Sequence, residues 1–263
     1  MKIATWNINS VRLRINIVLD VLKQNDLDIL CLQETKVEDN KFPLKPLHEA
    51  GYIHTIYRGQ RSYNGVCIIS RIPLDNVTKL DFAGKQDDAR HIGATLPNGL
   101  EIHNFYIPAG GDEPDVEINP KFKHKLDFVD DITKWFKSNR SANDNLMIMG
   151  DFNIAPLEHD VWSHKQLLKV VSHTPIEVEK LNKFKESISW IDVGRFFIPE
   201  NEKSYSWWSY RNRDWRKSNR GRRLDHIWVT PKLEESLHKH EILSNWRDVE
   251  KPSDHVPLII TIK

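Results

Sequence analysis

The residues best suited to chemistry are Asp151 and Asn153, which follow a short apolar run at 146–149 that is closed by Gly150 and followed by Pro156. Such a run predicts a buried strand that ends where the polar residues begin. Side chains two residues apart in an extended segment project to the same side, so a carboxylate and a carboxamide would face one point in space. The same residue types also start turns, and this motif alone leaves both interpretations open.

Other polar residues stand at the ends of further strand-like runs. Each has an ordinary alternative, because such residues can form turns, cap helices, pair with a neighbouring Arg or lie in the core. Their joint placement at strand ends instead predicts a site at one rim of a sheet. The residues concerned are Asn7, Glu34, Arg90, Tyr106, Asp225, Asp254 and His255.

The oxygen-rich composition of this set indicates a hard metal ion. Carboxylates from Glu34, Asp151 and Asp254, with the amides of Asn7 and Asn153, favour Mg²⁺ or Mn²⁺ over Zn²⁺. Separate histidines do not have the spacing of a zinc set and are expected at the surface. These are His159, His164 and His173.

His255 indicates which reaction the metal would serve. Asp225 can accept a hydrogen bond from its ring and fix its tautomer. A hard metal, a positioned imidazole and an aspartate base together suit hydrolysis of a phosphate ester. The sequence contains no glycine-rich phosphate loop, and no nucleophilic Ser-His-Asp or Cys-His order stands out.

The stretch 206–223 combines aromatic and basic residues. It holds three Trp, one Tyr, seven basic residues and a single acid, a local charge of +6 in a chain whose net charge is +1. Guanidinium groups contact phosphates, and aromatic rings between them can stack on bases or wedge between them. We therefore predict a nucleic-acid groove that opens onto the metal site. Its candidate DNA-binding residues are Trp207, Arg211, Arg213, Trp215, Arg216, Arg220 and Arg222.

Strands and helices alternate along the 263 residues, of which 39% are hydrophobic. Strands are expected at 2–6, 28–34, 52–57, 65–70, 76–82, 91–96, 100–107, 146–149, 191–197, 204–210, 224–230 and 256–262. Helices are expected at 120–139, at 177–189 and after the first strand, where Val11 lies on the apolar face and Ser10 is the cap. This order predicts an α/β sandwich of two packed sheets with helices outside, in a single domain spanning 1–263.

Two features bear on the cellular compartment. Cys31 and Cys67 lie inside apolar runs, which indicates buried, reduced thiols. The chain starts directly with a strand-like segment, without an export signal, and no apolar run approaches the length of a membrane span. We expect a cytoplasmic protein with no membrane partner, and a monomer.

Five motifs resemble those of the bacterial exonuclease III family of abasic-site DNA endonucleases, in the family's order and across almost the whole chain. They are Trp6-Asn7-Ile8-Asn9, Leu32-Gln33-Glu34-Thr35-Lys36, Gly150-Asp151-Phe152-Asn153, Asn219-Arg220-Gly221-x-Arg223-Leu224-Asp225 and Ser253-Asp254-His255. The resemblance implies a four-layer α/β sandwich of two mixed sheets flanked by helices, a magnesium-dependent reaction and a double-stranded DNA substrate.

The resemblance also implies roles for individual residues. Glu34 would be the main metal ligand, with Asn7 near the metal and Asp254 supporting the region. Asp151 would activate or position water, Asn153 would hold a phosphate oxygen, His255 oriented by Asp225 would contact the phosphate, and Tyr106 would bind it or stabilise the leaving oxygen. Arg90 matches a DNA-backbone contact, and Trp207 and Leu224 match the walls of a pocket for a sugar without its base.

Three positions depart from the family's pattern. Ala109 replaces an amide side chain that contacts phosphate, and Asp112 falls where some relatives insert an Arg into DNA. Arg222 stands where some relatives have an apolar or aromatic pocket wall. Any insertion into DNA would then fall to the region 213–216.

The sequence thus predicts a DNA-repair phosphodiesterase that cuts 5′ of abasic sites, digests 3′ to 5′ and cleans 3′ ends. One alternative keeps the chemistry but takes RNA, a small phosphate ester or a phospholipid. A second alternative is a nucleic-acid-binding module without catalysis. The intact set of carboxylates argues against it, because a protein that only binds has little use for carboxylates that face phosphate.

Overall fold

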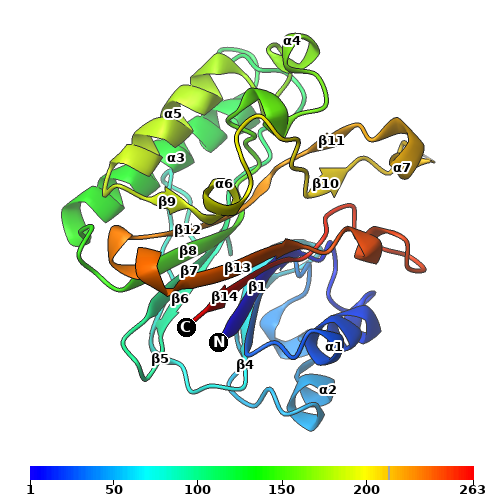
Figure 1. The fold of residues 1–263 in the computed structure, drawn as a ribbon, viewed down its shortest axis with the longest axis vertical. Coiled ribbons are helices and arrows are strands. Elements are labelled where there is room, and N and C mark those ends of the chain that lie inside the picture. Colours follow the sequence, from blue (N-terminus) through cyan, green and yellow to red (C-terminus); the bar gives the residue numbers. More distant parts are fainter. Residues whose placement is uncertain (213) are drawn as a thin grey trace.

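A computed structural model, which describes residues 1–212 and 214–263, contains two six-stranded β-sheets. The sheets pack face to face and helices cover their outer faces, giving four layers (Figure 1). Both sheets are mixed, because β1 runs parallel to β2 and β7 parallel to β8 while the remaining pairs are antiparallel. The predicted four-layer α/β sandwich is confirmed.

The first sheet has the order β13 (Leu237–Ile242), β14 (Leu258–Ile262), β1 (Lys2–Asn7), β2 (Ile29–Gln33), β4 (Tyr63–Ser70), β3 (Ile56–Gln60). The second has the order β5 (Asp75–Thr78), β6 (His91–Thr95), β7 (Glu101–Tyr106), β8 (Leu146–Asp151), β12 (Asp225–Val229), β9 (Ile191–Asp192). A separate ribbon pairs β10 (Trp207–Trp208) with β11 (Gly221–Arg222).

Apolar residues fill the space between the sheets and beneath the helices. The inner faces meet in one cluster that includes Ile3, Ile29 and Ile102. Outside the first sheet lie α1 (Ile15–Gln24) and α2 (Leu44–Glu49), and outside the second lie α3 (Pro120–Asn139) and α5 (Pro175–Glu186) (Figure 1). Burying both faces of each sheet fixes strand register, which in turn fixes where polar residues at strand ends project. The short helices are α4 (His164–Leu167), α6 (Val193–Phe197) and α7 (Trp215–Ser218), and 3₁₀ turns occur at Asp39–Lys41, Glu158–Asp160, Pro231–Ser236 and Ser244–Arg247.

The helix after the first strand begins later than predicted. It starts at Ile15, and Ser10 does not cap it. The backbone amides of Ile8, Ser10 and Val11 instead donate to the carbonyls of Gln33, Glu34 and Thr35. Residues 8–11 therefore extend the β1–β2 pairing as a loop, and the helix can begin only after it.

Other predictions also differ from the structure. The strands expected at 52–57, 76–82 and 204–210 are found at Ile56–Gln60, Asp75–Thr78 and Trp207–Trp208. The extended segment expected at 191–197 is a two-residue strand followed by α6, because the Asp192 carboxylate caps that helix at the Arg195 amide. Strand β13 was not predicted; its sequence Leu-His-Lys-His-Glu-Ile is mostly polar, as suits an edge strand. His173 is buried rather than at the surface, where it contacts the carbonyl of Ala155 and the ring of His164.

Cys31 and Cys67 are buried and unpaired, as predicted. Among the described residues, no helix has the length and apolar character needed to cross a membrane.

Candidate active site

Strand pairing brings the predicted residues to one rim of the sandwich. Asn7, Tyr106 and Asp151 are the last residues of β1, β7 and β8, and Glu34 directly follows β2. The antiparallel pairing of β8 with β12 places Asp151 opposite Asp225. Residues opposite each other in a ladder project to the same side, so this register sets two carboxylates together.

Local backbone geometry serves this placement. Gly150 has a φ of +141°, and a β-carbon there would lie 1.9 Å from the Phe105 carbonyl oxygen, so the approach of β8 to β7 requires glycine. Glu34 and Asn153 have φ values of 52° and 54°. A left-handed conformation costs a glutamate about 1–2 kcal/mol, and such strain gathers at functional sites.

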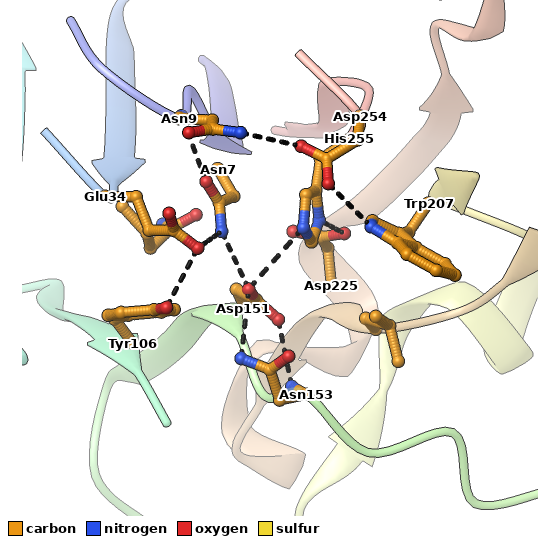
Figure 2. Close-up of polar contacts among 12 residues, drawn as sticks. Asn7, Asn9, Glu34, Tyr106, Asp151, Asn153, Trp207, Asp225, Asp254 and His255 are labelled. Atoms are coloured by element: carbon orange, nitrogen blue, oxygen red, sulfur yellow. Dashed lines mark hydrogen bonds and ion pairs between the residues drawn. The ribbon is translucent and has the colours of Figure 1, made fainter. Parts of the chain in front are cut away.

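Asn7 joins the acidic groups contributed by the two sheets. Its amide donates to Glu34 Oε1 at 2.9 Å and to Asp151 Oδ2 at 2.8 Å, as Figure 2 shows. The Tyr106 hydroxyl donates to the same Glu34 oxygen at 2.8 Å. Burial raises the pKa of Tyr106 well above its usual value, and the charges of Glu34 and Asp151 add to this, so its hydroxyl keeps its proton.

Asp151 lies at the centre of the cluster (Figure 2). It accepts from the backbone amide of Asn153 at 2.9 Å and from its side-chain amide at 3.2 Å. Burial raises the pKa of the Asp151 carboxyl to about 7, against the opposing effect of His255 and with a further rise from Asp225. A carboxylate with such a pKa can accept a proton near neutral pH.

His255 is oriented by Asp225, as predicted from the sequence. Its Nδ1 lies 2.8 Å from Asp225 Oδ2, and its Nε2 lies 3.7 Å from Asp151 Oδ2. Burial alone would lower the pKa of His255, but the charges of Asp225 and Asp151 raise it far above its usual value. The imidazole is therefore a cation at neutral pH, with Nε2 directed toward Asp151. Ser206 completes the arrangement by donating to Asp225 Oδ2 at 2.5 Å.

Three polar residues that the sequence analysis did not single out join the cluster. Asn9 donates to Asp254 Oδ1 at 3.2 Å, and Lys36 lies 2.7 Å from Glu34 Oε2 and 2.6 Å from Asn9 Oδ1. Asn9 and Lys36 stand two residues after Asn7 and Glu34 in the sequence. This spacing could have indicated that they belong to the site, because alternate residues of an extended segment project to the same side. The third, Lys125 of α3, is fully buried and donates to the Asn153 carbonyl at 2.7 Å. No local sequence pattern predicts this contact.

The charges in the cluster fit a divalent cation. Lys125 is paired with Glu177 and adds no net charge. Four carboxylates, those of Glu34, Asp151, Asp225 and Asp254, then face two cations, His255 and Lys36, which leaves two negative charges. Among the described residues, the group whose ligand atoms lie within 4.8 Å of one another is Asp151, Asp225 and His255. Since Asp225 is engaged with His255, the oxygens of Glu34 and Asp151, which Asn7 links, fit a hard ion better.

A cleft of about 510 Å³ opens over this cluster. The catalytic candidates Glu34, Asn153 and His255 share its lining with four of the predicted DNA-binding residues, Trp207, Arg211, Arg222 and Leu224. Trp207 also donates to Asp254 Oδ2 at 2.9 Å, so a predicted DNA-binding residue contacts a predicted metal ligand directly. Arg90 lies beside Tyr106, with its guanidinium carbon 4.7 Å from the ring centroid, and lines an adjoining hollow of about 390 Å³.

The other predicted DNA-binding residues do not line this cleft. Trp215 and Arg216 both contact Asp248, and Arg220 is exposed with its guanidinium carbon 4.8 Å from the Trp162 ring centroid. Arg223, counted in the basic stretch, is buried against Asp160 and Asp192. Arg213 lies outside the described residues.

The chain is similar to known proteins along its whole length. The model of the endonuclease/exonuclease/phosphatase family matches residues 4–255. Exodeoxyribonuclease III of Haemophilus influenzae is 30% identical, with 98% of each chain covered. The structure of an AP endonuclease from Archaeoglobus fulgidus superimposes with a TM-score of 0.93 and 34% identity, covering 100% of this chain and 99% of that one.

A 3′ phosphatase from Neisseria, bound to product DNA hairpin, superimposes with a TM-score of 0.91 and 30% identity over 100% of this chain and 99% of that one. The five motifs, the four-layer fold and these similarities agree. The chain is an enzyme of the endonuclease/exonuclease/phosphatase family, related to the exonuclease III group that its motifs predicted.

Proposed function

We propose that the chain is a magnesium-dependent DNA-repair phosphodiesterase that acts on double-stranded DNA. It would cut 5′ of abasic sites, remove nucleotides from 3′ ends and clear blocked 3′ ends. The observation that carries this proposal is the cleft itself, in which the carboxylates of Glu34 and Asp254 and the His255 imidazolium share one space with an aromatic and cationic wall. The names of the Archaeoglobus and Neisseria proteins support DNA ends and abasic sites as substrates.

The protein groups would divide the work of hydrolysis. Asp151 accepts the proton of the attacking water, because its raised pKa keeps it basic near neutral pH. Asn153 orients Asp151 and binds a phosphate oxygen, and His255, held as a cation by Asp225, donates from Nε2 to another. Tyr106 remains protonated and donates a hydrogen bond near the departing 3′ oxygen.

Glu34, Asn7, Asp151 and Asp254 would hold the metal ion. When bound, Mg²⁺, or Mn²⁺ in its place, offsets negative charge on the phosphate and the departing oxygen. The aromatic face of Trp207 and the side chain of Leu224 then form walls for a sugar that lacks its base.

We further propose a cytoplasmic monomer in which residues 1–263 form one domain. The residues that line the cleft range from Glu34 to His255, which fits one domain, and the unpaired buried thiols suit a reducing compartment.

The test is a 5′-end-labelled duplex with one tetrahydrofuran abasic analogue, incubated with Mg²⁺, Mn²⁺ or EDTA and resolved on a denaturing gel. A single metal-dependent cut 5′ of the analogue is the expected product. A ladder from the 3′ end without that cut would limit the function to end processing. Absence of any product, with release of phosphate from small phosphate esters, would overturn the proposal.

A further inference from the structure

Arg222 has an unusual environment for a cation in the cleft wall. Its Nη1 donates to the Ser172 hydroxyl at 2.7 Å and to the Val171 carbonyl at 3.1 Å. Within the described residues, its Nε is buried without an acceptor and its Nη2 makes no hydrogen bond. No carboxylate oxygen in the same described part of the chain lies within 4.0 Å of this guanidinium.

The unengaged Nε and Nη2 form one edge of the guanidinium fork. Two parallel N–H groups on such an edge match two oxygens of a phosphate or a carboxylate. Leaving a donor buried without an acceptor costs about 1–3 kcal/mol, so an unpaired cation here is expensive unless a ligand supplies the oxygens. Burial also lowers the pKa of Arg222, and the charge of Glu177 opposes that shift only in part.

The strand pairing locates this edge relative to the reacting phosphate. Trp207 is opposite Arg222 in the β10–β11 ribbon, and on its other side Trp207 bridges to His255. With neighbouring strands about 4.8 Å apart, the backbones of Arg222 and His255 are separated by about 10 Å. Opposite residues project to the same side, and the Arg222 guanidinium carbon lies 5.3 Å from the Trp207 ring centroid.

We propose that Arg222 binds an anionic group carried by the residue on the 3′ side of the scissile phosphate, and that it thereby sets substrate preference. This inference rests on the proposed function, which places the sugar of that residue against Trp207 and Leu224. The anion has two sources, namely the next phosphate of a continuous strand or a carboxylate at a blocked 3′ end. An apolar or aromatic side chain at position 222 would favour neither a substrate with a following phosphate nor one with a terminal carboxylate.

The experiment compares three duplexes in Mg²⁺. The first has an internal tetrahydrofuran followed by a phosphate, the second a 3′-terminal tetrahydrofuran with a free hydroxyl, and the third a 3′-phosphoglycolate. kcat/KM is measured for the wild type, Arg222→Gln and Arg222→Lys. The control is Lys169→Gln, which removes an exposed positive charge from the segment leading to Val171.

In Arg222→Gln, we expect kcat/KM for the internal site, the phosphoglycolate or both to fall by about 10- to 100-fold relative to the terminal tetrahydrofuran, the size of a lost charge-assisted contact. A fall for only one of the two identifies the source of the anion. Arg222→Lys should retain part of the preference, and Lys169→Gln should leave the ratios unchanged.

Equal losses on all three duplexes would overturn the inference, because they would mean that Arg222 only anchors Val171 and Ser172. Should Arg222→Gln not fold, unchanged ratios in Arg222→Lys, which lacks the paired fork, would overturn it as well. Failure of the wild type to cut any duplex would overturn the proposed function together with this inference.

Discussion

Two buried clusters of charged side chains differ in their balance of positive and negative groups. The balanced cluster consists of Asp160, Asp192, Arg195 and Arg223, two carboxylates with two guanidinium groups. The active-site cluster places four carboxylates around His255 and Lys36. Arg223 and Asp225, two residues apart, belong to different clusters.

The pKa values show what this difference in balance does. Burial would raise the pKa of Asp160, but Arg223 and Arg195 lower it to about 2, so its charge is satisfied within the fold. In the active-site cluster burial raises the pKa of Asp151 to about 7, and the charges of Asp225 and Glu34 add to that rise while His255 opposes it. A balanced buried cluster thus holds loops together, whereas an unbalanced one still needs a cation and can exchange a proton.

Replacing Asp151 with Asn should give the largest change in rate. Loss of a positioned general base lowers kcat by roughly 10²–10⁴-fold. Stability should stay within about 1 kcal/mol of the wild type, since the lost hydrogen bonds at Oδ2 are offset by removal of a charge beside Asp225. Single-turnover cleavage and urea unfolding measure the two quantities. Cleavage at the wild-type rate would exclude Asp151 as the base.

The same substitution in the balanced cluster is the matched control and should act on stability instead. Asp160→Asn leaves two guanidinium groups with one carboxylate and turns an amide donor toward the N–H groups of Arg223, which lie at 2.7 and 2.9 Å from the present oxygens. Breaking a buried ion pair in this way costs about 3–5 kcal/mol. We expect urea unfolding to show that loss, while kcat per folded molecule remains unchanged. A slow but fully stable variant would contradict the distinction between the clusters.

The sequence predicted the active-site cluster better than the balanced one. Asn7, Glu34, Asp151 and His255 stand at the ends of recognisable strands, so local pattern placed them at one rim. The partners of Arg223 are 31 and 63 residues away, and only the tertiary fold brings them together.

The basic stretch shows the same limit on prediction. Counting charges at 206–223 gave +6, but Arg223 is neutralised inside the fold and Arg216 pairs with Asp248. Composition predicted a cationic wall, and the structure places two of its cations, Arg211 and Arg222, in the lining of the cleft. The loop at 8–11 was mistaken for a helix start because its apolar residues are buried by strand pairing rather than by helical periodicity.

Two histidines extend the comparison to pH. His226 lies beside the balanced cluster, where its Nε2 contacts the Ile154 carbonyl at 2.8 Å and its Nδ1 contacts Arg223 at 3.1 Å. The first partner only accepts and the second only donates, so the ring is neutral. Burial, and then the charge of Arg223, lowers the pKa of His226 to about 4, whereas that of His255 is raised.

The two shifts give stability contributions of opposite sign. Between pH 6.5 and 4 the unfolded chain binds a proton at His226 that the folded chain does not, so His226 lowers stability by up to about 3 kcal/mol as pH falls. The contribution of His255 to stability is fully present below its unfolded pKa and is lost as pH rises toward its folded pKa.

Urea unfolding in EDTA tests this with His226→Gln and His255→Gln. Relative to the wild type, His226→Gln should gain stability as pH falls toward 4, and His255→Gln should recover stability as pH rises above 6.5. Parallel profiles for the wild type and both variants would mean that charge balance does not set the protonation of either ring.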